Sequence, residues 1–181
     1  MYNPLKALLL IAIITFSATG CSAQSEELPA TYSSSKNITE FTFYKVLPIY
    51  VPGNWKELFY SKSSGQHFFE SAAEGNIAIA INPFDLYPFH KAGMGNSDFV
   101  KAFAKWDIDY HRENGLTVEV LADSTTEKGF IVWKSTEKDG TRNVYLFTGK
   151  EGLVFNYLAY SKTTPDKDLM KTVLGIYREN R

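Results

Sequence analysis

The chain is poor in the residues on which disulfides and metal sites depend. It has one cysteine and three histidines among its 181 residues. One cysteine excludes an intramolecular disulfide, and no two of the histidines, at positions 67, 90 and 111, have the i,i+4 spacing of a zinc-binding pair. The sequence therefore predicts a fold held together by its apolar core alone, with no metal and no other cofactor.

The chain also lacks an excess of charge of one sign and lacks recognisable catalytic motifs. The 19 basic and 20 acidic residues nearly cancel, whereas a nucleic-acid-binding surface requires clustered Lys and Arg. Ser61, Ser63 and Ser64 precede His67, but none of these serines lies in the Gly-x-Ser-x-Gly turn of serine hydrolases. We therefore expect neither a nucleic-acid-binding protein nor an enzyme.

An apolar run at the N-terminus is too short to cross a bilayer. Residues 7–18 follow Lys6 and are almost entirely apolar, whereas a spanning helix needs about 20 such residues. The run ends in Ala18-Thr19-Gly20-Cys21, and small residues before a cysteine are typical of the cleavage site of bacterial lipoproteins. We expect residues 1–20 to be a lipoprotein signal peptide and Cys21 to carry the lipid that ties the chain to a membrane.

The segment around Cys21 also indicates where the chain works. A lipoprotein exported in this way faces the periplasm, and Ser22, which is not the aspartate that retains enterobacterial lipoproteins at the inner membrane, favours the outer membrane. Residues 21–38 are polar, so we expect a lipidated cysteine and a flexible tether. Residues 39–181 predict one globular domain. An ordinary secretory signal, cut near Ala23, is the alternative interpretation of the N-terminus.

Alternating apolar residues predict an antiparallel sheet in this domain. We expect strands at residues 66–72, 76–81, 128–135, 142–148 and 153–160, several of them joined by short turns that contain glycine. The last three strands are apolar on both faces, unlike a sheet with one face in water. Both of their faces must therefore be covered by other elements.

Two segments with helical spacing complete the predicted fold. The first helix is capped at Asn96-Ser97-Asp98 and ends near Asn114, with an apolar stripe that includes Phe99, Val100, Phe103, Trp106 and Tyr110. The second begins at Thr164-Pro165-Asp166, with Thr164 as its cap. Two amphipathic helices and a two-faced sheet predict an α+β fold, a three-layer α/β/α sandwich with a central antiparallel sheet.

The order of these elements resembles that of the PsbP/Mog-like superfamily, which includes DcrB-type bacterial envelope lipoproteins. The resemblance depends on a Pro-Gly-x-Trp unit between Tyr50 and Trp55, a helix after a long loop, a strand meander and a closing helix. It covers most of residues 39–180. It implies an adaptor or assembly role, and none of its motifs assigns a functional residue in this chain.

One loop, residues 82–95, is more apolar than an ordinary connection. Its large side chains include Phe84, Leu86, Tyr87, Phe89 and His90, and long apolar loops are frequently functional. In one interpretation Phe84, Leu86 and Phe89 fold inward and close the end of the sheet. In the other, Tyr87, Phe89 and His90 reach outward to a partner or cover a ligand. We take Phe84, Tyr87, Phe89 and His90 as the candidate partner-binding or ligand-binding residues.

Together these features predict a membrane-tethered periplasmic lipoprotein that acts without catalysis. We expect it to work through contacts with another envelope protein whose identity the sequence does not give. Two alternatives stay open. One is a lipoprotein that binds a small molecule beneath the apolar loop, and the other is an immunity protein that blocks a periplasmic toxin.

Overall fold

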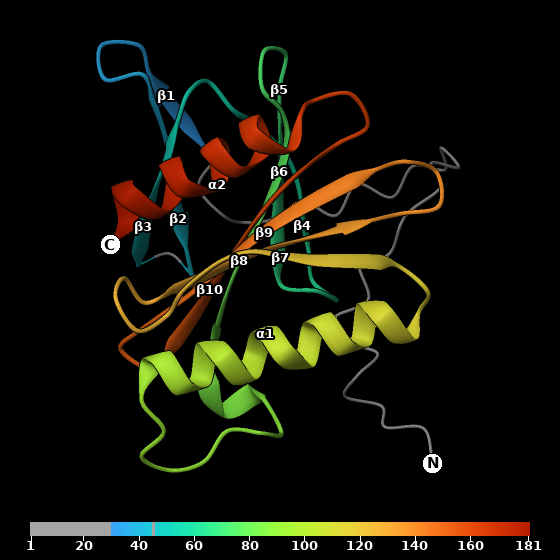
Figure 1. Cartoon of the computed structure of the whole chain (residues 1–181). Coiled ribbons are helices and arrows are strands. Elements are labelled where there is room, and N and C mark those ends of the chain that lie inside the picture. The colour runs from blue at the N-terminus through green and yellow to red at the C-terminus, as the bar shows by residue number, and fades with distance from the viewer. Residues whose placement is uncertain (1–29, 45) are drawn as a thin grey trace.

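The structure is a computed structural model that describes residues 30–44 and 46–181 (Figure 1). Cys21 and the expected signal peptide lie outside the described residues. The described part forms two antiparallel sheets and two α-helices, which confirms the predicted α+β class. The smaller sheet has the order β1-β2-β3, from β1 (Thr31–Ser33), β2 (Ile38–Phe43) and β3 (Leu47–Pro52).

The larger sheet has seven strands in the order β4-β5-β6-β10-β9-β8-β7. They are β4 (Lys56–Ser61), β5 (Gln66–Ser71), β6 (Gly75–Pro83), β7 (Thr117–Ser124), β8 (Phe130–Thr136), β9 (Arg142–Lys150) and β10 (Leu153–Ser161). The helices are α1 (Asn96–Glu113) and α2 (Asp166–Asn180). Strands β8, β9 and β10 are the meander that the sequence predicts, and β10 pairs with β6 along eight residues.

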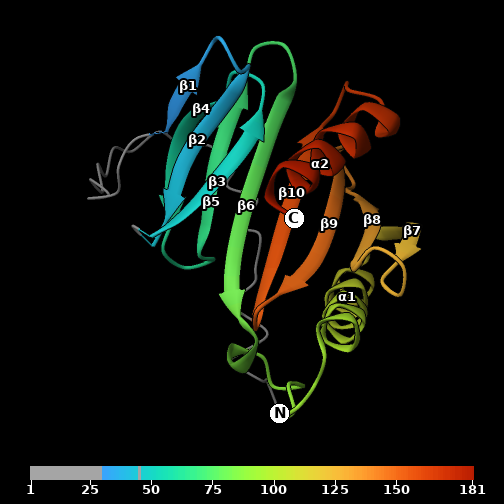
Figure 2. The same cartoon turned by 90° about the vertical axis from the view of Figure 1, so that its left-hand side faces the viewer.

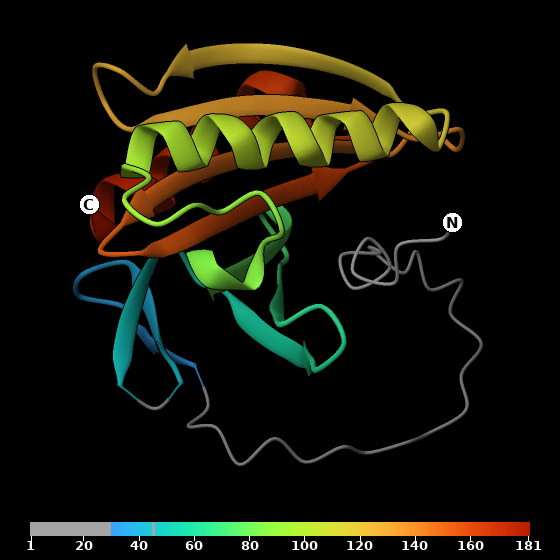
Figure 3. The same ribbon diagram turned by 90° about the horizontal axis from the view of Figure 1, so that it is seen from below.

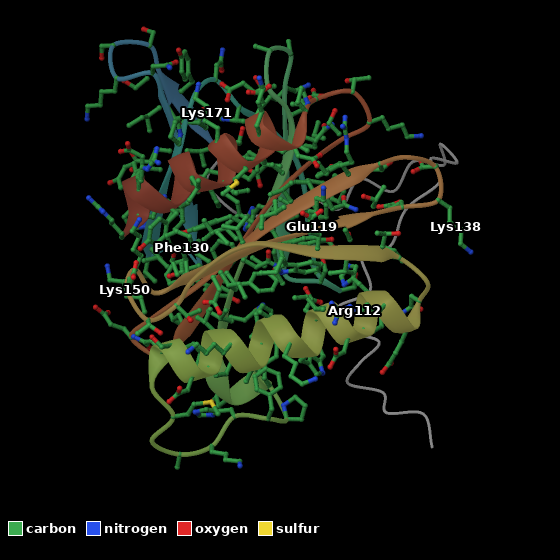
Figure 4. All side chains as sticks on the ribbon, viewed as in Figure 1. Arg112, Glu119, Phe130, Lys138, Lys150 and Lys171 are labelled. Atoms are coloured by element: carbon green, nitrogen blue, oxygen red, sulfur yellow. The ribbon has the colours of Figure 1, made fainter. Side chains whose placement is uncertain are left out.

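The two faces of the large sheet are covered by different elements. Helix α1 contacts β7, β8 and β9 from one side, and α2 contacts β9, β10 and β3 from the other (Figures 1 and 2). The small sheet lies on the same side as α2, because side chains of β2 and β3 join Ile77 and Ile79 of β6 and Leu169 of α2 in one buried cluster. Phe130 lies on this side as well, edge-on to Tyr177 of α2 (Figure 4).

Strands β8 to β10 are buried on both faces, as their sequence requires. Along β9, Val144 and Leu146 join the cluster beneath α2, whereas Tyr145 and Phe147 join the cluster beneath α1. Burial of a side chain of this size contributes roughly 1.5–3 kcal/mol. The small sheet beside α2 was not predicted from the sequence as a separate sheet.

Several predicted boundaries differ from the structure. Strand β1 begins at Thr31, inside the segment expected to be a tether, so the folded domain begins before residue 39. Gly95 is the N-cap of α1, and the hydroxyl of Ser97 donates to the carbonyl of Thr125. Pro165 takes the same position in α2 without a side-chain cap from Thr164. Both helices begin where predicted, but neither has the expected side-chain cap. Packing of their apolar faces on the sheet stabilises them instead.

The Pro-Gly-x-Trp unit is a buried corner after β3. Gly53 has φ = +98°, a conformation that favours glycine. The Trp55 indole donates to the carbonyl of Pro52 at 2.7 Å, and the buried Thr39 hydroxyl both donates to Gly53 O and accepts from Trp55 N. The corner therefore joins the small sheet to the start of β4.

The outer strands of the large sheet are irregular. The pairing register shifts between Glu57 and Phe59 in β4 and between Val120 and Ala122 in β7. Neither described helix has the length and hydropathy to span a bilayer.

Candidate functional site

A pocket of about 360 Å³ opens where four segments of the described chain meet. These segments are the connection after β2, the end of β4 with the turn to β5, the end of β6 with the loop that follows it, and the middle of α1; their ribbons can be followed in Figure 3. Its walls combine aromatic, aliphatic and polar side chains: Tyr44, Tyr60, Lys62, Ser63, Ser64, Gly65, Asn82, Leu86, Tyr87, Pro88 and Trp106. Ligand pockets typically measure about 300–1,000 Å³ and place a few polar groups in an apolar lining.

The first part of the loop is fixed to the domain by Phe84. A single 3₁₀ turn, Phe84–Leu86, follows the end of β6, and Phe84 N donates to the carbonyl of Gly152 at 2.8 Å. The Phe84 ring is buried and lies parallel to that of Phe99 of α1, with centroids 3.6 Å apart. Phe84 is therefore a core residue that holds the loop against α1.

Tyr87 is also turned inward, but its hydroxyl reaches the pocket. Its ring stands edge-on to Phe103 at 4.9 Å and to Trp106 at 5.9 Å. The side-chain amide of Asn82 donates to the Tyr87 hydroxyl at 3.2 Å. Burial raises the pKa of Tyr87 above that of an ordinary tyrosine, so the phenol keeps its proton and can donate it.

Phe89 and His90 are half-buried in the same aromatic group. Phe89 lies 5.3 Å from Phe99, and His90 stands edge-on to Phe84 at 6.0 Å. The loop thus packs on α1 through the four candidate residues. Leu86, expected to turn inward, is 57% exposed and lines the pocket instead.

The opposite wall comes from residues that no sequence motif indicates. Tyr44 is 49% exposed, and its hydroxyl donates to the carbonyl of Ile81 at 3.1 Å. Tyr60 comes from β4, and Lys62 and Ser64 come from the following turn. These positions are distant in sequence from the loop, so no local pattern connects them with it.

His67 lies behind this wall and not at the surface. The residue is buried, and its ring is 4.8 Å from that of Phe43 and 4.7 Å from that of Tyr60. Its Nδ1 lies 2.7 Å from Glu57 Oε1, which orients the imidazole. The carboxylate gives a buried polar group a hydrogen-bond partner within an aromatic environment.

A second cluster of titratable side chains lies beneath α1. His111 Nδ1 donates to the carbonyl of Asp107 at 2.9 Å, and the Tyr145 hydroxyl donates to His111 Nε2 at 3.2 Å. Burial raises the pKa of Asp107 to about 7 and lowers that of His111. His111 is therefore held neutral near pH 7, and the Asp107 carboxyl gains or loses its proton close to that pH. No set of three metal-binding side chains occurs in the described part of the chain.

The chain is thus an α+β domain with an open pocket lined largely by aromatic and aliphatic side chains. No protein-family model matches the chain, and no curated protein matches it. Among solved structures the chain is similar to a protein from Bacteroides thetaiotaomicron, at 12% identity and a TM-score of 0.41 over 83% of this chain. It spans about half of that protein, 47% of its length.

Cyanobacterial PsbP from Synechocystis is a second structural neighbour. Its solution structure matches with 12% identity and a TM-score of 0.48, over 90% of this chain and 96% of that one. This similarity concerns the fold at most. It transfers no site residue and no activity to the present chain.

Proposed function

We propose that the chain is a membrane-tethered lipoprotein of the bacterial envelope that acts without catalysis, as an adaptor or assembly factor that contacts another protein. The lipid would be carried by Cys21, and the domain would face the periplasm, at the outer membrane. The signal-like run that ends in Ala18-Thr19-Gly20-Cys21 supports this location. We further propose a three-layer sandwich of the PsbP/Mog-like kind, which the Pro-Gly-x-Trp unit and the order of the elements support.

The observation that carries the proposed contact role is the apolar rim of the pocket. Tyr44 is 49% exposed and Leu86 is 57% exposed, and both line the pocket. Val46, two residues after Tyr44, is 81% exposed. Large apolar side chains around a concave site are typical of protein-binding surfaces, where a pocket receives an anchor residue from the partner.

In-cell photo-crosslinking tests this role. A photo-reactive amino acid is introduced at position 86 of the full chain, and separately at position 120 in β7, where Val120 is 47% exposed at the opposite edge of the large sheet. We expect a discrete protein adduct from position 86 only, and we expect Tyr44→Ser to reduce it. Equal adducts from both positions, or none from either, would contradict the proposal.

The volume of the pocket favours a small molecule as a second candidate. About 360 Å³ lies within the range of small-molecule sites. Native mass spectrometry of the protein as purified distinguishes the two functions. A defined extra mass of a few hundred daltons, lost on denaturation and absent from a Tyr87→Ala variant, would support the ligand and would replace the adaptor role.

A further inference from the structure

The polar end of the pocket has groups that no described residue uses. The Ser64 hydroxyl is buried and has no hydrogen-bond partner among the described residues. A buried polar atom of this kind normally has a partner in the protein, in water or in a ligand. Lys62 lies two residues earlier in the same turn, is exposed, and forms no ion pair with a carboxylate of the described residues. One hydroxyl and one ammonium group at this end suit an anionic acceptor.

The other end of the pocket is apolar. Trp106, Leu86 and Pro88 line it, and Trp106 is half-buried beside Tyr87. Among the described residues that line the pocket none is acidic, and Lys62 is the one with a formal charge. An occupant that complements both ends has a large apolar group and a negative charge within a few bonds of each other.

We propose that the pocket binds the C-terminal residue of a partner protein, with a large apolar side chain against Trp106 and Leu86 and the terminal carboxylate at Lys62 and Ser64. This inference rests on the contact role proposed above. A chain end carries both groups on one residue, whereas an internal segment of the partner lacks the carboxylate. Capture of a C-terminal carboxylate is an established mode of peptide recognition.

The size of the pocket agrees with a single anchor residue. Its volume of about 360 Å³ is near the lower limit of ligand sites, so it holds one large side chain with the adjoining backbone and not a longer segment. The pocket is open to solvent, which lets the rest of the partner leave past the exposed Leu86.

Fluorescence anisotropy with labelled peptides tests the inference on the full-length protein in detergent. The probes are a flexible Gly-Ser peptide ending in Phe with a free carboxylate, the same peptide with a C-terminal amide, and one ending in Ser with a free carboxylate. We expect saturable binding of the first and at least about fivefold weaker binding of the other two, because each lacks one of the two groups.

Matched variants assign the carboxylate to its partners. Lys62→Gln and Ser64→Ala should weaken the free-acid peptide about threefold to tenfold and leave the amide unchanged, and high salt should reduce the advantage of the acid. Lys167→Gln, an exposed lysine in α2, is the control and should change neither. Leu86→Ser should weaken both Phe peptides.

Equal binding of the acid and amide peptides would overturn the chain-end inference. An absence of peptide binding would also overturn it. If position 86 still crosslinks to a protein in cells, the contact role stands and only the chain-end inference fails. If position 86 gives no adduct either, both fail.

Discussion

The burial of single polar residues in α1 could not be predicted from the sequence pattern. His111 lies in the last turn of α1, and its ring is buried between Asp107 and Tyr145. Asp107 lies on the buried face of α1. An aspartate is charged in water, so helical periodicity alone does not predict its burial in the core. Whether such a residue is buried depends on the sheet beneath it, which the local sequence does not describe.

Asp107 should make stability depend on pH. Its pKa in the folded chain is about 7, whereas that of an unfolded aspartate is about 3.9. Between these values the folded state binds the proton more tightly, so stability falls as pH rises, by at most about 1.4 kcal/mol per pH unit. We therefore expect Asp107→Asn to raise the melting temperature near pH 8 and to change it little near pH 4.

The exposed neighbour Asp109 provides the control for this experiment. Asp109→Asn should leave the pH profile of the melting temperature nearly unchanged, since that side chain is 40% exposed. His111 contributes in the opposite sense. Its lowered pKa gives stability above the unfolded value, about 6.5, that is lost as pH falls through the folded value. A similar gain from Asp107→Asn at both pH values would contradict the assignment.

At the level of elements, the sequence predicts the interior strands better than the outer ones. Strands β8, β9 and β10 are buried on both faces, so nearly every position is apolar and the pattern is strong. Strands β4 and β7 lie at the edges and are exposed along much of their length, so their pattern is weak. The pocket was likewise predictable only in part. The apolar loop is recognisable in the sequence, but Tyr44, Tyr60 and Ser64 are brought to it only by strand pairing.

Two substitutions in the loop should separate its core from its binding surface. Phe84→Ala removes a ring stacked on Phe99 and should cost about 3–5 kcal/mol of the free energy of unfolding. Leu86→Ser changes a side chain that is 57% exposed and should change stability by less than about 0.5 kcal/mol. Chemical denaturation of both variants measures the difference. Comparable losses would mean that Leu86 is part of the core.

For the whole molecule, attachment to the membrane and folding of the domain should be independent. If Cys21 carries the lipid, Cys21→Ala should move the protein from the membrane fraction to the soluble periplasmic fraction and abolish labelling by a fatty-acid analogue. The melting temperature of the domain should stay the same, because the described fold begins at residue 30. A Cys21→Ala protein that remains in the membrane fraction would show that another segment attaches it.

The irregular outer strands of the large sheet affect whether two copies of this protein can pair edge to edge. A flat outer strand offers a row of unused backbone donors and acceptors on which a second copy can extend the ladder, the first step towards fibrous aggregates. In β4 and β7 the register shifts at Glu57/Phe59 and at Val120/Ala122 interrupt that row and increase the local twist. We therefore expect neighbouring copies to find no straight template along β4 or β7.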